Sequence, residues 1–184
     1  MTTAPRVQFS LDRIPLFAAV LVALGGALVL LQLWMVFFWV PTESTMGVVQ
    51  RIFYVKIPAA WIGYLAFGLA ALCSGVYLWL RDDRLDAAAL SAVEGGLAFF
   101  TIVLIAGPLW GKISWGTYWE WEPRLTMSLL LWAIFVGYLL VRTSVEGVER
   151  ARRLAAVVAI VGALNVPLVH VSVNWLRSLH PEPV

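Results

Sequence analysis

The stretch IPAAWIGYLAFGLAALCSGVYLWL at residues 57–80 decides the fold, because it runs for 24 residues without a charged side chain. A helix needs about 20 apolar residues to cross a lipid bilayer. Four further stretches have the same character: residues 14–40, 87–110, 125–141 and 154–176. Only Glu94 places a formal charge inside these stretches. The sequence therefore predicts an all-α, polytopic bundle of about five transmembrane helices that forms a single domain over residues 1–184.

The composition agrees with a membrane protein and excludes several other classes. Of the 184 residues, 61% are hydrophobic and 13% are charged, whereas a soluble domain has about 25% charged residues. A cytosolic enzyme, a disordered tail and a nucleic-acid binder therefore fit poorly. Cys73 is the only cysteine, so the chain has neither an internal disulfide nor the Cys-x-x-Cys-His motif for covalent haem.

The basic residues predict how the chain is oriented, because Lys and Arg near helix ends favour the cytoplasmic side. A cytoplasmic N-terminus places eight basic residues inside and five outside. The five outer ones are Arg51, Lys56, Lys112, Arg124 and Arg177. We therefore expect the N-terminus in the cytoplasm and the C-terminus outside. In this orientation most tryptophans lie on the outer side, and the inner loops at residues 81–86 and 142–153 are expected to be ordinary charged loops.

The segment WGTYWEWEPR at residues 115–124 is the most informative part of the chain. A short interfacial helix would bring Trp115, Trp119 and Glu122 onto one face, together with Tyr118. One interpretation is a belt of aromatic residues at the membrane surface. The density of rings equally suits a platform for a large flat ligand, and the sequence leaves both interpretations open.

Other candidate residues lie near the same predicted surface. His180 follows the last span and is reachable from water, whereas His170 is about 15 Å deeper along a helix, so the two cannot bind one metal from a continuous helix. Lys56 precedes Pro58, which we expect in the first turn of the second span. Lys56 is either an interfacial cation or, with the other outer cations and the tryptophans, part of a site for an apolar, planar, doubly anionic ligand. Glu94 is a functional candidate by its depth, or a group bonded to a neighbouring helix.

Two motifs resemble a known family. GPLWGK at residues 107–112 and WGTYWEWEPRLT at residues 115–126 resemble the tryptophan-rich signature of haem-handling proteins, and closely that of the cytochrome c maturation protein C family. YVKIPAAW at residues 54–61 and VNWLRSLH at residues 173–180 support the resemblance.

The resemblance implies a plasma-membrane protein that holds haem b transiently and non-covalently on its outer face and catalyses no covalent reaction. It implies delivery to a haem chaperone, cytochrome c maturation protein E, beside maturation proteins A, B and D. The haem-binding residues that it implies are Lys56, Trp115, Trp119, Trp121, Glu122, Arg124 and His180, with His180 as the metal ligand.

The chain departs from the family pattern at three points. At the position of Lys56 the family usually has a histidine. That histidine and the histidine that matches His180 are the two axial ligands of the haem iron. At the position of Glu122 the family commonly has an aspartate. It also usually has a sixth span. Metal binding needs a deprotonated amine, which costs an ordinary lysine about 4 to 5 kcal/mol at pH 7. We therefore favour His180 as the single family-type ligand. Lys56 either pairs with a haem propionate or with Glu122, which needs no proton loss, or ligates iron if burial lowers its pKa.

Two other functions fit the sequence less well. A permease-like subunit that moves haem or another amphipathic solute through the bilayer would need polar or broken helices near the midplane. Glu94, His170 and the stretch at residues 165–167 are the only such features. A bis-histidine electron carrier would need two histidines that face one haem, and this chain cannot build that site alone.

Overall fold

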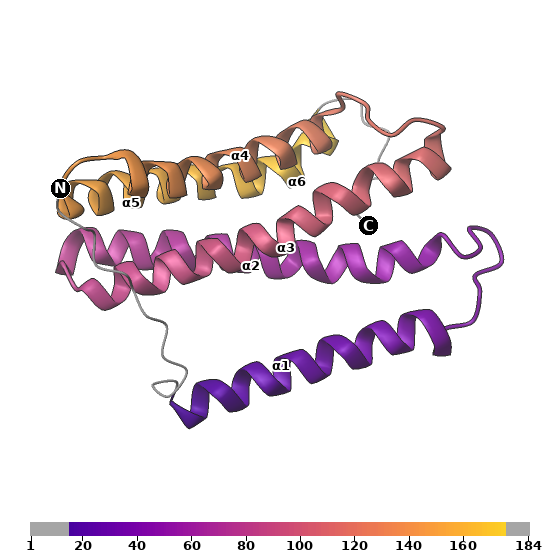
Figure 1. The fold of residues 1–184 in the computed structure, drawn as a ribbon. Helices are drawn as coiled ribbons and strands as arrows, with labels where there is room; N and C mark the ends of the chain where they lie inside the picture. The colour runs from indigo at the N-terminus through magenta and orange to yellow at the C-terminus, as the bar shows by residue number, and fades with distance from the viewer. Residues whose placement is uncertain (1–14, 176–184) are drawn as a thin grey trace, which may run out of the picture. The chain divides into compact units, whose positions relative to one another are not determined.

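The computed structural model describes residues 15–175 of the chain, and in this part the chain is helical (Figure 1). The elements are α1 (Leu16–Trp34), the π-helix η2 (Met35–Trp39), α2 (Gln50–Leu80), α3 (Asp83–Trp115), α4 (Pro123–Ser144), α5 (Val148–Ala163) and α6 (Asn165–Trp175). The all-α class predicted from the sequence is confirmed.

Five helical segments are long and apolar enough to cross a membrane: Leu16–Trp39, Gln50–Leu80, Asp83–Trp115, Pro123–Ser144 and Val148–Val169. They correspond in order to the five predicted spans, so the prediction of a polytopic membrane bundle is confirmed. The observed helices are longer than most of the predicted apolar stretches, because their ends carry charged residues that the apolar criterion left out.

The chain divides into two compact units, residues 1–51 and residues 52–184. In the first unit, α1 has no buried residue, and most of its large apolar side chains are exposed. The loop after η2 is held by Glu43, whose carboxylate accepts hydrogen bonds from the backbone N–H groups of Thr45 and Met46. A helix that is apolar on all sides is typical of a membrane span.

The core of the second unit is a column of phenylalanines between α2, α3 and α4. Phe67 of α2 stacks on Phe135 of α4 with ring centroids 3.9 Å apart, and it also meets Phe100 of α3 at 5.6 Å. Two glycines make this packing possible. A Cβ atom on Gly63 would lie 2.8 Å from the Phe100 ring, and one on Gly96 would lie 2.7 Å from the Phe67 ring. Small residues at such positions let membrane helices approach closely.

The fifth span is two helices rather than the single helix that the sequence predicts. Helix α5 ends at Ala163, and α6 begins at Asn165. The buried side chain of Asn165 donates a hydrogen bond from Nδ2 to the carbonyl oxygen of Met127 in α4 at 2.9 Å. Pro167 follows within the first turn of α6, where the missing N–H of a proline is tolerated. The break is therefore fixed to α4 by a side-chain contact.

Helix α2 also differs from the prediction, because it begins eight residues before Pro58. That proline lies inside the helix and not in its first turn. The seven residues after Gln50 contain neither Gly nor Pro, so nothing in them prevents helix formation. Lys56 is therefore part of the helix and not of the loop before it.

One end of the second unit is joined by ion pairs, and we call it the ion-pair end (Arg81, Asp86, Arg142 and Arg152, with their partners). Asp86 of α3 is 4% exposed, and both of its oxygens accept hydrogen bonds from Arg142 of α4, at 2.5 and 2.8 Å. Arg152 of α5 reaches Asp86 at 3.2 Å and Asp83 at 2.7 Å. The prediction of ordinary charged loops here is wrong, since a buried carboxylate bridges three helices.

Candidate functional site at the tryptophan end

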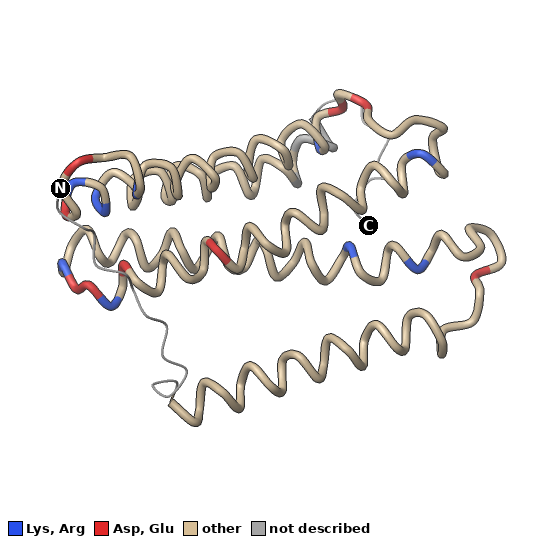
Figure 2. Tube along the Cα trace, in the orientation of Figure 1, with Lys and Arg blue, Asp and Glu red and all other residues tan. Residues whose placement is uncertain are grey.

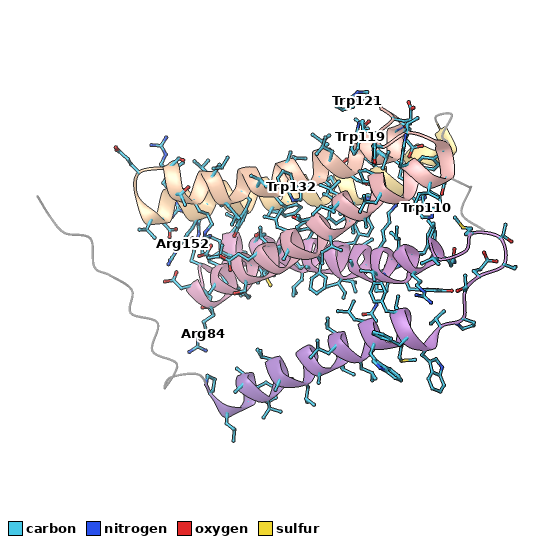
Figure 3. All side chains as sticks on the ribbon, turned by 45° about the vertical axis from the view of Figure 1, so that its right-hand side comes forward. Arg84, Trp110, Trp119, Trp121, Trp132 and Arg152 are labelled. Carbon is cyan, nitrogen blue, oxygen red and sulfur yellow. The ribbon has the colours of Figure 1, made fainter. Side chains whose placement is uncertain are left out.

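The opposite end of the second unit carries the tryptophan-rich segment. We call it the tryptophan end (Lys56 of α2, residues 107–115 of α3, the loop at residues 116–122 and Arg124 of α4). Figure 3 shows Trp110, Trp119 and Trp121 at this end of the bundle and Arg152 at the other. The charged residues likewise gather toward the helix ends in Figure 2.

The tryptophan-rich segment is a folded loop. Helix α3 ends at Trp115, because Gly116 adopts a left-handed conformation with φ +84°, which glycine tolerates best. The ammonium of Lys112 donates a hydrogen bond to the Gly116 carbonyl at 2.8 Å and lies over the Tyr118 ring at 5.2 Å. The expectation of a short interfacial helix with one aromatic face is therefore wrong.

A glycine allows the start of this loop to lie close against α3. A Cβ atom on Gly111 would lie 3.3 Å from the Trp115 ring and 3.4 Å from the Thr117 carbonyl oxygen. Trp115 packs edge-on against Trp110, with centroids 5.1 Å apart and an interplanar angle of 84°. Trp110 is buried and also contacts Phe53 of α2 at 5.5 Å. These rings join the ends of α2 and α3.

A second pair of rings lies farther along the loop. Trp119 and Trp121 are also perpendicular, with centroids 5.6 Å apart and an interplanar angle of 79°. Trp121 is 76% exposed, whereas Trp119 is partly buried. The indole N–H of Trp119 is buried and finds no hydrogen-bond acceptor in the part of the chain that the structure describes. The loop thus offers an exposed ring beside a buried donor.

Lys56 lies where α2, α3 and α4 meet. Its ammonium is 5.5 Å from the centroid of the Trp110 ring. A Cβ atom on Gly107 of α3 would lie 3.7 Å from this ammonium and 3.9 Å from Leu125 of α4. Gly107 therefore lies within van der Waals range of both the lysine and α4.

Two charged residues at the start of α4 complete the group. Glu122 is the N-cap residue of α4 and is 7% exposed, and its carbonyl accepts hydrogen bonds from the backbone and the hydroxyl of Thr126. Pro123 occupies the first turn, where its fixed φ suits the helix. The charges of Glu122 and Arg124 both act on the Lys56 ammonium. Both charged residues therefore lie near Lys56.

Four of the predicted site residues thus fall into two groups in the structure. Lys56 and Trp115 meet through Trp110, and Trp119 pairs with Trp121. Each tryptophan pair is perpendicular, so the rings do not form one flat face in this structure. His180 and Arg177 lie outside the described residues. The side chain of His170 is likewise outside what the structure describes.

The sequence reasoning did not assign Trp110, Phe53 or Gly107 to the site. Trp110 contacts both Lys56 and Trp115 and so connects the two helices that carry them. A signal for Phe53 was present, because residues three apart share a helix face and Phe53 precedes Lys56 by three. The sequence-based prediction begins the second span at residue 57, so it does not use this signal.

Comparisons with known proteins identify the family that this sequence resembles. The sequence profile of a family described as Heme exporter protein C matches residues 3–183. Heme exporter protein C of Bradyrhizobium diazoefficiens is 38% identical over 76% of this chain and 53% of its own length. That of Escherichia coli K12 is 34% identical over 78% of this chain and 59% of its own length. A ccmC-like mitochondrial protein of Marchantia polymorpha is 30% identical over 89% of this chain and 69% of its own length. The chain therefore spans little more than half the length of the first of these relatives.

Proposed function

Because the chain belongs to the Heme exporter protein C family, we propose that it binds haem at the tryptophan end and delivers it to a haem chaperone for cytochrome c maturation. The observation that carries the proposal is the meeting of cations and aromatic rings at one end of a membrane bundle. Lys56 lies over Trp110. In the loop that follows α3, Tyr118 and Trp121 are exposed.

Haem is the cargo, and its chemistry suits these residues. Its porphyrin is flat and apolar, and aromatic rings contribute both buried area and specific contacts to such a surface. Its two propionates are anionic, and Lys56 and Arg124 supply positive charge. The perpendicular tryptophan pairs present both ring faces and ring edges. Binding in this proposal is transient and non-covalent, and haem b is the form carried.

Lys56 acts in the proposal through its charge. An ordinary lysine is protonated at pH 7, so a hydrogen bond from its ammonium to a propionate needs no proton loss, whereas iron binding does. Its place over Trp110 supports this role, because a cation is stabilised by a ring face. Glu122 lies near the same ammonium and carries the opposite charge.

His180 is the proposed axial ligand of the haem iron. It lies outside the described residues, so this role depends on the family resemblance and on its place after the last span. A neutral imidazole is mostly present at pH 7 and binds iron without an energetic penalty for proton loss. One histidine and no second family ligand predict five-coordinate haem.

The remaining parts of the proposal concern setting and partners. We place the protein in the plasma membrane with the N-terminus in the cytoplasm and the tryptophan end outside. The haem chaperone, cytochrome c maturation protein E, receives the haem, and maturation proteins A, B and D work beside the chain. The protein itself performs no covalent chemistry and acts as one domain over residues 1–184.

A permease-like role is the second candidate, and the break between α5 and α6 favours it. Broken helices line substrate sites in transporters. Here, however, Asn165 at the break is buried and its amide is bonded to the Met127 carbonyl. That contact satisfies the polar group inside the bundle, so we prefer the haem-delivery proposal.

An optical titration of the purified full chain with haem tests the proposal. We expect saturable binding with a five-coordinate spectrum, lost in His180→Ala and retained in His170→Ala. Lys56→His should convert the spectrum to six-coordinate low-spin haem if positions 56 and 180 face one iron. Binding that is equal in both histidine variants would remove His180 as the ligand.

The orientation has its own test. A reporter enzyme fused after Val184 should be active only outside the cytoplasm. Cytoplasmic activity would overturn the proposed sidedness and place the tryptophan end on the wrong side for delivery.

A further inference from the structure

Glu94 is the acidic residue of α3 that lies away from both ends of the helix. The other charged residues of α3 are Asp83, Arg84 and Asp86 in its first turn and Lys112 near its end. Figure 2 shows this contrast as an isolated acidic position along α3, apart from the charges at the helix ends. Neither the ion-pair end nor the proposed haem site uses Glu94.

The depth of Glu94 follows from the rise of the helix. It lies eight residues beyond Asp86, or about 12 Å, and 18 residues before Lys112, or about 27 Å. A hydrocarbon core of about 30 Å, centred between those two charged residues, reaches several ångströms beyond Glu94 toward Asp86. The carboxylate therefore lies at the level of the lipid chains.

The side chain also points away from the bundle. Val93, Leu97 and Phe100 of the same helix are buried in the core, whereas Glu94 is exposed. Its neighbours on the exposed face are small: Ala87, Ser91, Gly95 and Ala98. A Cβ atom on Gly95 would meet nothing within 4 Å. This face of α3 is therefore shallow enough for another helix to pack closely against it.

A carboxylate facing lipid is costly unless a partner group binds it. Among the described residues, no side chain donates a hydrogen bond to the Glu94 carboxylate or forms an ion pair with it. The group that satisfies Glu94 must therefore come from outside this part of the chain.

Charge complementarity decides between the available occupants. Helix α1 carries no cation, since Gln32 is its one polar side chain. A second copy packed through the same face would bring two Glu94 carboxylates together, and like charges in an apolar medium repel strongly. A helix with a lysine or arginine at this depth would instead neutralise Glu94.

We propose that the α3 face formed by Ala87, Ser91, Glu94, Gly95 and Ala98 docks a transmembrane helix of a different subunit, which presents a basic side chain to Glu94. The small residues let the partner helix approach closely. The carboxylate determines that the partner side chain is basic and at what depth in the membrane it lies. The interface lies away from the tryptophan end and does not depend on haem.

The test uses the full chain in liposomes with two synthetic transmembrane peptides. Both are Leu-Ala helices with one cysteine, and they differ only by a lysine or a leucine at the midpoint of the inner half. The chain carries Cys73→Ala and Ala98→Cys, and disulfide cross-linking is measured after oxidation. We expect the lysine peptide to cross-link about three- to tenfold more than the leucine peptide, the range that interhelical polar contacts support.

Matched variants separate the carboxylate from general packing. Glu94→Gln should abolish the preference for the lysine peptide, and Glu94→Asp should keep most of it. A cysteine on an exposed face of α2, in Leu72→Cys with Cys73→Ala, should show no preference.

Three results would overturn the proposal. The first is equal cross-linking of the two peptides. The second is efficient disulfide formation between two Ala98→Cys chains without peptide, which would identify a second copy as the occupant. The third is slower modification of Ala98→Cys than of Leu72→Cys by a membrane-soluble maleimide in the chain alone, which would mean that the chain covers this face itself. None of these readouts involves haem, so the haem proposal stands or fails separately.

Discussion

The two ends of the second unit use their cations in opposite ways. At the ion-pair end, Arg142 and Arg152 are bound by the carboxylates of Asp83 and Asp86. At the tryptophan end, Lys56 and Lys112 lie over aromatic rings, and Lys112 also binds a backbone carbonyl. All the ion pairs between described side chains that we observe lie at the first end. Charges that neutralise each other stabilise a fold, whereas a cation held over a ring keeps its charge for an anionic ligand.

The largest expected effect is at the ion-pair end. Asp86→Leu leaves the mostly buried Arg142 guanidinium without its carboxylate. Removal of one partner of a buried pair costs about 3 to 5 kcal/mol, so the free energy of unfolding should fall by about that amount. Denaturant unfolding in detergent measures it. A loss below about 1 kcal/mol would mean that this end resembles an exposed surface and would remove the contrast between the two ends.

The double variant Asp86→Leu with Arg142→Leu is the matched control for this prediction. It removes both members of the pair, and replacement of a buried pair by apolar residues is often neutral. The double variant should therefore recover most of the stability that the single variant loses, with haem binding unchanged in both.

The next effect is at the tryptophan end. Trp119→Ala should weaken haem binding by about tenfold or more, because the ring contributes about 0.5 to 1.5 kcal/mol beyond its buried area, and the lost area adds to that. Haem titration measures it, with Trp121→Ala alongside. Trp79→Ala is the control, since Trp79 is exposed near the end of α2 that adjoins the ion-pair end. Equal affinities in all three variants would reduce the motif to an aromatic belt.

A smaller effect is expected for Lys56→Gln. Loss of a partly exposed charge contact weakens binding by about two- to fivefold, and the affinity should become less sensitive to salt. Lys56→Arg should restore both the affinity and its salt dependence. If Lys56→Gln instead changed the iron spectrum, Lys56 would be a metal ligand and not a partner of a propionate.

The smallest effect is expected for Arg81→Ala. Arg81 pairs with Glu149 at 3.2 Å, but both side chains are about half exposed, at 44% and 51%. Exposed pairs contribute about 0 to 1 kcal/mol, so the free energy of unfolding should change by less than 1 kcal/mol. A larger loss would show that the ion-pair end depends on its surface as well as on Asp86.

The sequence predicted those features that depend on hydrophobic length. The five spans are long apolar runs, and each appears as a helix in the structure. The sequence also places Gly116 among the tryptophans, but the spacing of the aromatic residues predicts a helix. A single left-handed glycine outweighed that periodicity, because it ends α3 before the motif begins.

The ion-pair end was not predicted, because its partners are far apart in the chain. Asp86 and Arg142 are separated by 56 residues, and Tyr77 and Glu149 by 72. Sequence spacing reports neighbours within one helix, such as the pair Glu149 and Arg153. It does not report which helix ends meet after packing. For the candidate site, the residue types were predicted, whereas the role of Trp110 as the contact between Lys56 and Trp115 required the structure.

The prolines inside α2 and α3 have a mechanical consequence for the tryptophan end. Pro58 lies eight residues after the start of α2, and Pro108 lies seven residues before the end of α3. Each removes one backbone hydrogen bond from its helix, so the first two turns of α2 and the last two turns of α3 bend more easily than the rest. Lys56 and Trp115 lie on these two tips, whereas the phenylalanine column lies deeper in the bundle. Bending at the two prolines therefore moves Lys56 and Trp115 relative to each other without unpacking the core.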